Sequence, residues 1–233
     1  MRGNKAGAVG LWVVLHLAAA VGAVEAQVPP SAAERLAYEG LLAAAARGDA
    51  QEIRRLTGAG ASPAVRDPRG RTALHVAAFG AHHEAMRALV VAGADPNALE
   101  ADRYDIVTIA AVADDLPTLR LALELGGDPR NVTSIWDGTA LIAAAHLGHA
   151  EVVRTLIRAG APLDHVNNLG WTALIESIVL GDGGPRHTDT LRALVAAGAD
   201  VNLEDRGGRT PLELALQRGY QPMAGLLRQA GAR

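Results

Sequence analysis

The sequence predicts an all-α repeat solenoid: an elongated stack of helix-turn-helix units with short β-hairpin or loop fingers. Two sequence markers recur in step about every 33 residues over most of the chain, which is the signature of a repeat architecture. Apolar residues make up 49% of the chain, enough to build a core, but aromatic residues make up only 3%. The core must therefore rest on alanine, leucine, valine and isoleucine, which suit thin helices packed close together.

The first marker is a glycine-based turn at the end of each unit. Glycine tolerates the left-handed backbone that ends many helices, and the Asp, Asn or Pro residues that follow it shape a projecting turn. Successive glycines are separated by 33, 33, 34, 38 and 33 residues. The copies are Gly60-Ala61-Ser62-Pro63, Gly93-Ala94-Asp95-Pro96, Gly126-Gly127-Asp128-Pro129, Gly160-Ala161-Pro162-Leu163, Gly198-Ala199-Asp200-Val201 and Gly231-Ala232.

The second marker begins the first helix of each unit. Its threonine hydroxyl can cap the free amide groups of the first turn, and the Leu and Ala residues that follow bury a narrow apolar face. The copies are Thr72-Ala73-Leu74-His75, Thr139-Ala140-Leu141-Ile142, Thr172-Ala173-Leu174-Ile175 and Thr210-Pro211-Leu212-Glu213, with Asp105-Ile106-Val107-Thr108 in the same place. A single unit cannot bury its apolar face, so stability depends on the interfaces between neighbours.

The two markers together resemble the ankyrin family, most fully in the segment 70–78, which reads Gly-Arg-Thr-Ala-Leu-His-Val-Ala-Ala. The resemblance covers roughly residues 34–233. It implies a slightly curved stack of helix pairs with hairpin fingers along one edge. It also implies that a protein partner binds to the finger tips and to the inner, concave face of the first helices.

The repeat spacing predicts a domain organisation. We expect a capping unit over 34–66, because its helix 34–47 lacks the threonine marker, followed by repeats at about 67–99, 100–133, 134–166, 167–204 and 205–233. Residues 27–33 are expected to be a linker.

The first 26 residues predict a signal peptide. Arg2 and Lys5 precede an almost uncharged run, and Val24-Glu25-Ala26 places small residues at the positions before a cleavage site. Cleavage after Ala26 would deliver the protein to the periplasm or outside the cell, with no stable membrane anchor. An uncleaved anchor is the alternative.

Two units depart from the repeat pattern. In the third, Arg103 replaces the expected glycine and Asp105 the threonine, which predicts a distorted finger; Asp115 and Pro117 can still begin its second helix. This unit is either a degenerate repeat that the fold tolerates or a loop re-aimed to contact a partner. The unit at 167–204 carries five extra residues within 181–188, whose glycines and proline predict an irregular surface loop. This loop either clasps the neighbouring repeat or presents Asp182, Arg186 and His187 to a partner.

Composition argues against several function classes. The net charge of −3 gives no basic stripe for nucleic acid, and the absence of cysteine removes disulfides and thiolate chemistry. The histidines near 82 and 146–149 are better explained by local hydrogen bonds than by metal binding. No phosphate-binding loop or nucleophile motif is present. We therefore expect a non-enzymatic protein with no cofactor and no metal.

The repeat register predicts which residues face a partner. Of the six aromatic residues after the signal peptide, four lie at variable exposed positions of the units, and large aromatic side chains carry much of the energy of interfaces. Arginines flank them at both ends of the stack. The alternative is that the tryptophans pack against neighbouring fingers and stiffen the stack. The predicted contact residues are Arg69, Arg71, Phe79, Tyr104, Trp136, His146, Trp171, Arg206 and Arg209.

These observations predict a monomeric adaptor or inhibitor in the periplasm that binds one protein partner. Two alternatives stay open: a structural, self-associating component of the cell envelope, and a secreted effector directed at a host cell.

Overall fold

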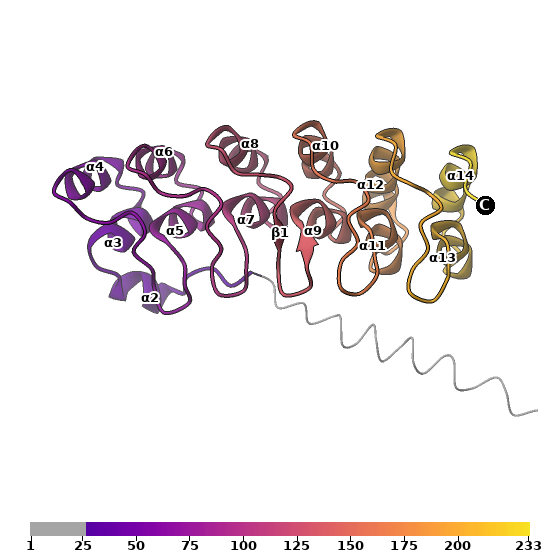
Figure 1. The fold of residues 1–233 in the computed structure, drawn as a ribbon, viewed down its shortest axis with the longest axis horizontal. Helices are drawn as coiled ribbons and strands as arrows, with labels where there is room; N and C mark the ends of the chain where they lie inside the picture. The colour runs from indigo at the N-terminus through magenta and orange to yellow at the C-terminus, as the bar shows by residue number, and fades with distance from the viewer. Residues whose placement is uncertain (1–26) are drawn as a thin grey trace, which may run out of the picture.

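The computed structural model describes residues 27–233, and these form one elongated stack of helix pairs (Figure 1). An inner row of helices lies beside an outer row, and fingers project along the lower edge of the view. The inner helices are α3 (Gly40–Arg47), α5 (Ala73–Phe79), α7 (Ile106–Val112), α9 (Ala140–His146), α11 (Ala173–Val179) and α13 (Pro211–Gln217). The outer helices are α4 (Ala50–Gly58), α6 (His83–Val91), α8 (Leu116–Glu124), α10 (Ala150–Arg158), α12 (Pro185–Ala196) and α14 (Gln221–Gln229). The predicted repeat solenoid is confirmed.

The inner helices begin where the second marker predicts. The hydroxyls of Thr72, Thr139 and Thr172 each accept a hydrogen bond from the backbone N–H three residues later. Asp105 supplies its carboxylate for the same bond to Thr108 N, at 2.8 Å. A carboxylate caps a helix as well as a hydroxyl does. The third unit therefore keeps its helix start although it lacks the threonine.

A single apolar core runs along the stack between the two rows. Leu74, Leu141 and Leu174 of the second marker are fully buried, and the alanines beside them bring neighbouring helices close together. Each inner helix packs against the next inner helix and against the outer helix of its own unit. Stability thus lies in the contacts between units, as expected for a solenoid.

The predicted continuous helix over 34–47 is wrong. The chain forms α2 (Ala32–Ala37) and then α3, because Tyr38 is in an extended conformation and Gly40 has a φ of +52°. The break lets the Tyr38 hydroxyl donate a hydrogen bond to Asp67 Oδ2, at 2.6 Å, in the first finger.

The predicted irregular loop at 181–188 is only partly correct. The irregular segment is short, and α12 begins at Pro185, which makes it 12 residues long where α10 has 9. Proline at the first helical position has a backbone angle already suited to the helix. The extra residues therefore lengthen an outer helix instead of forming a long loop.

In the part of the chain that the structure describes, one finger forms strands: β1 (Val132–Thr133) pairs antiparallel with β2 (Gly138–Thr139). Within residues 27–233, no helix has both the length and the apolar character that a membrane crossing requires. The predicted signal peptide lies outside these residues.

Candidate protein-binding face

Every finger from the second unit onward is closed by the same side-chain turn. An oxygen-bearing residue five positions before the helix cap accepts hydrogen bonds from the backbone N–H groups two and four residues later. The residues in this role are Asp67, Glu100, Ser134, Asn167 and Asp205. This turn was not predicted from the sequence, although an oxygen-bearing side chain stands five positions before the cap residue of each inner helix from α5 to α13.

The finger of the third unit, 100–105, keeps this turn despite its departures from the repeat pattern. Glu100 accepts from Asp102 N and Tyr104 N at 3.0 and 3.1 Å, and Arg103 takes a φ of +66° at the position that is Gly70, Gly170 or Gly208 in three other fingers. The finger that carries β1 and β2 has Asp137 there, with a φ of +53°. Left-handed backbone costs a non-glycine residue about 1 kcal/mol. Arg103 also makes a 2.9 Å ion pair with Asp137 of the next finger. The predicted distortion is therefore confined to one strained residue.

A hollow of about 200 Å³ opens between the middle inner helices and their fingers, and we call it the concave pocket. Its walls come from three consecutive units. They are Gln27, Tyr104, Thr108, Val112, Thr133, Ser134, Trp136, Gly138, Thr139, Ile142, Ala143, His146, Leu147, Asn167, Leu169, Glu176 and Leu180. The walls are mostly apolar, while polar groups gather at one side.

Glu176 is the charged residue in these walls. Its side chain is 6% exposed, and one carboxylate oxygen accepts a 2.8 Å hydrogen bond from Asn167 Nδ2. The other oxygen lies 3.5 Å from Nδ1 of His146. Burial raises the pKa of Glu176 to about 7, against the opposing effect of the Asn167 hydrogen bond. Burial, with a smaller contribution from His187, lowers the pKa of His146.

The N-terminal segment 27–31 lies against the first fingers instead of hanging free as a linker. Gln27 is buried beside the finger that carries β1, and the segment runs back from there to α2 (Figure 1). The carbonyl of Val28 accepts a 3.1 Å hydrogen bond from the guanidinium of Arg71. Segment 27–31 therefore covers the first part of the concave face.

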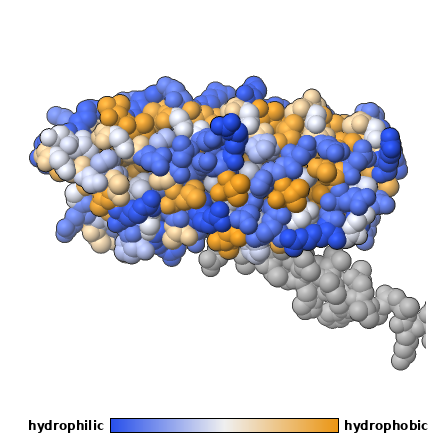
Figure 2. All heavy atoms as spheres, viewed as in Figure 1, coloured by the Kyte–Doolittle hydropathy of each residue, from blue (hydrophilic) through white to orange (hydrophobic). Residues whose placement is uncertain are grey.

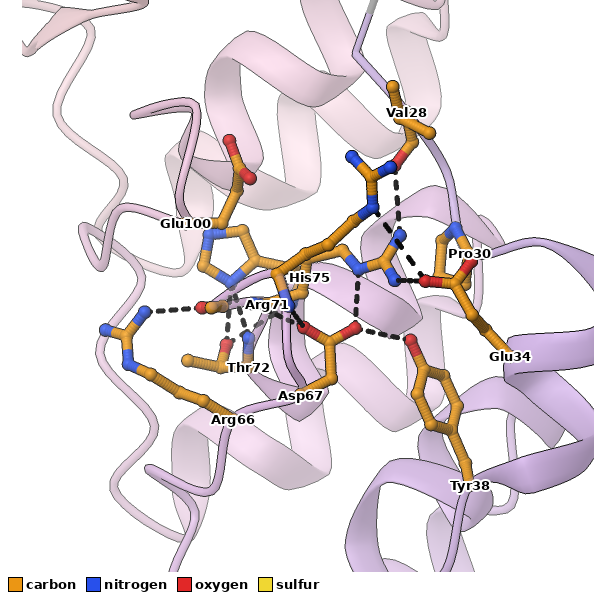
Figure 3. Close-up of polar contacts among 12 residues, drawn as sticks. Val28, Pro30, Glu34, Tyr38, Arg66, Asp67, Arg71, Thr72, His75 and Glu100 are labelled. Carbon is orange, nitrogen blue, oxygen red and sulfur yellow. Dashed lines mark hydrogen bonds and ion pairs between the residues drawn. The ribbon is translucent and has the colours of Figure 1, made fainter.

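Arg71 holds the N-terminal segment against the first finger (Figure 3). Its side chain is 1% exposed, with Nε 2.6 Å from Asp67 Oδ2 and a second ion pair to Glu34. Asp67 also receives the Tyr38 hydroxyl. The predicted partner contact at Arg71 is therefore wrong. Its guanidinium N–H groups already bond to groups within the fold, and its side chain is not accessible to a partner.

The other predicted contact residues fall into three groups. Arg69, Arg206 and Arg209 are exposed, and Phe79, Trp136 and His146 are half-buried. Tyr104 and Trp171 are each only 8% exposed, so they pack within the stack. Trp171 fits the alternative that it stiffens the stack. Of the nine residues, the structure brings Tyr104, Trp136 and His146 together at the concave pocket.

The segment 181–188 contacts units on both sides of its own. His187 Nε2 lies 2.9 Å from the backbone carbonyl of His146, and Arg186 lies 3.6 Å from Asp114. The aromatic ring of Tyr220 closely covers Gly183, and its hydroxyl donates to the carbonyl of Gly181. Asp182 and Arg186 stay exposed.

Other histidines link neighbouring units through backbone carbonyls, and His83 does so through the hydroxyl of Thr118. His82 Nε2 lies 3.2 Å from the carbonyl of Ala46, and His149 Nδ1 lies 3.0 Å from that of Ala111. His75 is 1% exposed and contacts Thr72 and the carbonyl of Tyr104. Within 27–233, no group of three or more His, Cys, Asp or Glu side chains is placed to hold a metal ion.

On the side shown in Figure 2, hydrophobic residues form separate patches among hydrophilic ones.

Comparison with known proteins gives consistent matches. A family model for ankyrin repeats (3 copies) matches residues 15–103 and 107–205. The putative ankyrin repeat protein YahD of Escherichia coli K12 is 35% identical over 192 residues, covering 82% of this chain and 95% of that protein. An ankyrin repeat domain from Acinetobacter baumannii AYE superposes with a TM-score of 0.78 at 43% identity, covering 83% of this chain and 98% of that one. The ankyrin repeat protein EF0377 gives 0.76 at 30% identity, covering 82% and 98%.

Proposed function

The chain belongs to the ankyrin-repeat family, and on that premise we propose that it is a periplasmic adaptor or inhibitor that binds one protein partner. Ankyrin repeats are protein–protein interaction modules. What we propose beyond this general role is that the chain binds a single protein partner and that it does so in the periplasm. The compartment rests on the N-terminal sequence alone, where a basic start, an apolar run and small residues before Gln27 are typical of a signal peptide.

The concave pocket is the observation that supports binding through this face. It lies where the fingers meet the inner helices, and it leaves Trp136, Leu147 and Leu169 accessible in a chain with very few aromatic residues. A half-buried tryptophan beside a mostly apolar hollow is typical of the centre of a protein interface. A partner segment that fills the hollow would bury this apolar surface.

The residues of the pocket support binding better than catalysis. Glu176 and His146 are 3.5 Å apart, but no serine, threonine or second carboxylate completes a nucleophile or acid–base arrangement with them in the described contacts. The relatives that match this chain along most of their length are themselves ankyrin-repeat proteins.

A pull-down tests the proposal. The bait is the protein from residue 27 to 233, which contains every core residue described, and the prey is the cell-envelope fraction. Lys5 is the only lysine in the sequence, so a photo-activated cross-linker is needed instead of an amine-reactive one. We expect one protein to be captured by the native bait and lost with a Trp136→Ala, Leu169→Ala variant.

The matched control is Val91→Ala, because Val91 is 88% exposed on the outer helix α6, away from the fingers. This control should capture the same protein as the native bait. Equal capture by the pocket variant and the native bait, with both showing the same helicity, would refute binding through the concave pocket.

A further inference from the structure

We propose that the concave pocket selects its partner by accepting one basic side chain, a lysine or arginine of an extended segment, with its aliphatic stem on the apolar wall and its cation at Glu176. This inference rests on the proposed function, since it specifies the chemistry of the partner that the same face binds. Four features of the described residues support it.

The first feature is the shape and lining of the pocket. A cavity of about 150 Å³ is enough to bind a small organic molecule, and this hollow is about 200 Å³. Trp136, Ile142 and Leu169 line the apolar part, with Glu176 among the polar lining residues. Long basic side chains have this same division, because an apolar stem carries a charged head.

The second feature is the lack of a strong cation beside Glu176. Within residues 27–233, no arginine lies within 4.0 Å of the Glu176 carboxylate. The only basic group of these residues within that distance is His146, at 3.5 Å. The pKa of His146 is lowered by burial, so His146 is a poor source of positive charge at neutral pH. A buried carboxylate normally has a charged partner, and a bound cation would supply one.

The third feature comes from the repeats of the chain itself. Glu176 stands four residues after the cap residue Thr172 of its inner helix. The corresponding positions in the other four capped units are apolar: Val76, Ile109, Ala143 and Leu214. Those units fold into the same helix pair, so the repeat architecture does not require an acid at this position.

The fourth feature is Gln27 at the same pocket. Gln27 is 8% exposed, and its side-chain nitrogen is buried without a hydrogen-bond partner among the described residues. Buried amide donors are normally paired. A carbonyl of a bound extended segment is a chemically suitable acceptor for this donor.

A purely structural role for Glu176 would consist of its hydrogen bond with Asn167. Glu176→Gln separates the two roles, because glutamine keeps an oxygen that accepts from Asn167 Nδ2 and removes the negative charge. The variant should therefore keep the fold and lose the selection for a cation.

The first test uses two small probes of nearly the same shape, n-butylguanidinium, which is cationic, and N-butylurea, which is neutral. The protein is 27–233 with a Gly-Ser extension before Gln27, so that no new α-amino group enters the pocket. The indole N–H resonance of Trp136, assigned with Trp136→Phe, reports binding. We expect native protein to bind butylguanidinium at least tenfold more tightly than butylurea, and Glu176→Gln to bind both equally weakly.

The pH dependence provides a second readout. The titratable groups of the pocket are Tyr104, His146 and Glu176, with His187 of α12 in contact with His146. Because the pKa of Glu176 is about 7, its ionised fraction rises about tenfold from pH 6 to pH 8, and cation affinity should rise by a similar factor. Protonation of His146 in acid repels a cation and acts in the same direction.

Equal affinity for the two probes in native protein, or unchanged discrimination in Glu176→Gln, would overturn the inference. The captured partner then separates this inference from the proposed function. A partner lost with both Glu176→Gln and the Trp136→Ala, Leu169→Ala variant supports both proposals. A partner lost only with the latter variant leaves the proposed function standing and refutes selection by a basic side chain.

Discussion

The first and last fingers of the stack carry the same ion pair in different surroundings. Arg71 pairs with Asp67 and Arg209 with Asp205, each at 2.6 Å and each four residues after its aspartate. The Arg71 side chain is 1% exposed, whereas that of Arg209 is 44% exposed. The ion pair of the repeat is thus the same at both ends. The difference in exposure between the two arginines comes from the residues that cover each ion pair.

Segment 27–31 and α2 supply that cover at the first finger. The Val28 carbonyl, Glu34 and Tyr38 all contact Arg71 or its aspartate, and no corresponding segment covers Arg209 among the described residues. The concave face is therefore closed at its N-terminal end and open from the pocket onward. Position in the repeat sets the local bonds, while the N-terminal segment decides which part of the face a partner can reach.

The largest expected effect compares the two aspartates. Asp67→Asn and Asp205→Asn both keep the oxygen that accepts the turn N–H groups and remove the charge that faces the arginine. The loss should cost about 3 kcal/mol of unfolding free energy at the covered finger, where Arg71 stays buried, but less than about 1 kcal/mol at the exposed finger. Urea unfolding of both variants measures the difference. Equal losses of unfolding free energy in the two variants would show that burial of the ion pair by the N-terminal segment does not change its contribution to stability.

The second prediction concerns acid and the closed end of the face. Burial lowers the pKa of His75 to about 4, below its usual value near 6.5. Between pH 6.5 and 4, His75 therefore binds a proton in the unfolded chain but stays neutral in the folded chain. The free energy of unfolding falls as pH falls through this window. The contribution reaches about 3 kcal/mol at pH 4 and vanishes above pH 7.

Comparing His75→Gln with native protein isolates this contribution. Unfolding free energies at pH 7.5 and pH 4.5 should show a smaller acid loss in the variant, since glutamine does not titrate. An acid loss of the same size in both proteins would contradict the assignment to His75.

The open part of the face should respond to pH with the opposite sign. The folded-state pKa of Glu176 is raised from 4.5 to about 7, so its burial costs nothing below pH 4.5, and the cost grows between pH 4.5 and 7 and is complete above pH 7. Glu176→Gln should stabilise the protein at pH 8, by about 3 kcal/mol at most, and change little at pH 4.5. Thermal unfolding at the two pH values measures this, and destabilisation at pH 8 would mean that the carboxylate is well paired in the native fold.

The smallest expected effect comes from removing residues 27–31. The segment contributes few core contacts, so the loss of unfolding free energy should be about 1 kcal/mol, the size of one or two hydrogen bonds. Amide hydrogen exchange should nevertheless show less protection in the first finger, 67–72, and no change in the last, 205–210. Loss of protection at both ends would indicate general destabilisation and not removal of a local cover.

The sequence predicted the repeats because their determinants are local. A cap residue, an apolar face and a glycine turn recur within each unit, and Asp105 could be placed although it replaces a threonine. Exposure was not predictable in the same way. Arg71 and Arg209 each follow an aspartate by four residues and stand between a glycine and a threonine, and a segment about 40 residues away makes only Arg71 buried.

The burial of Glu176 in the pocket was likewise not predictable from its sequence neighbours. Glu176 reads locally as an ordinary polar residue of a helix, and its burial depends on Trp136, Leu169 and Asn167 of two fingers. Comparing its position across the units would have singled it out, because the other capped units are apolar there. The sequence predicts a partner contact for both Trp136 and Trp171, but Trp171 is buried within the stack while Trp136 lines the pocket.

Site-specific photo-crosslinking in intact cells tests the central claim most directly, namely that the open part of the concave face binds a protein partner. A photoreactive residue would replace Leu147, which is 37% exposed at the pocket, and in a second variant Val91 on the outer helix α6. We predict one cross-linked protein from position 147 and none from position 91. Cross-links from position 91 alone, or the same protein from both positions, would contradict the claim.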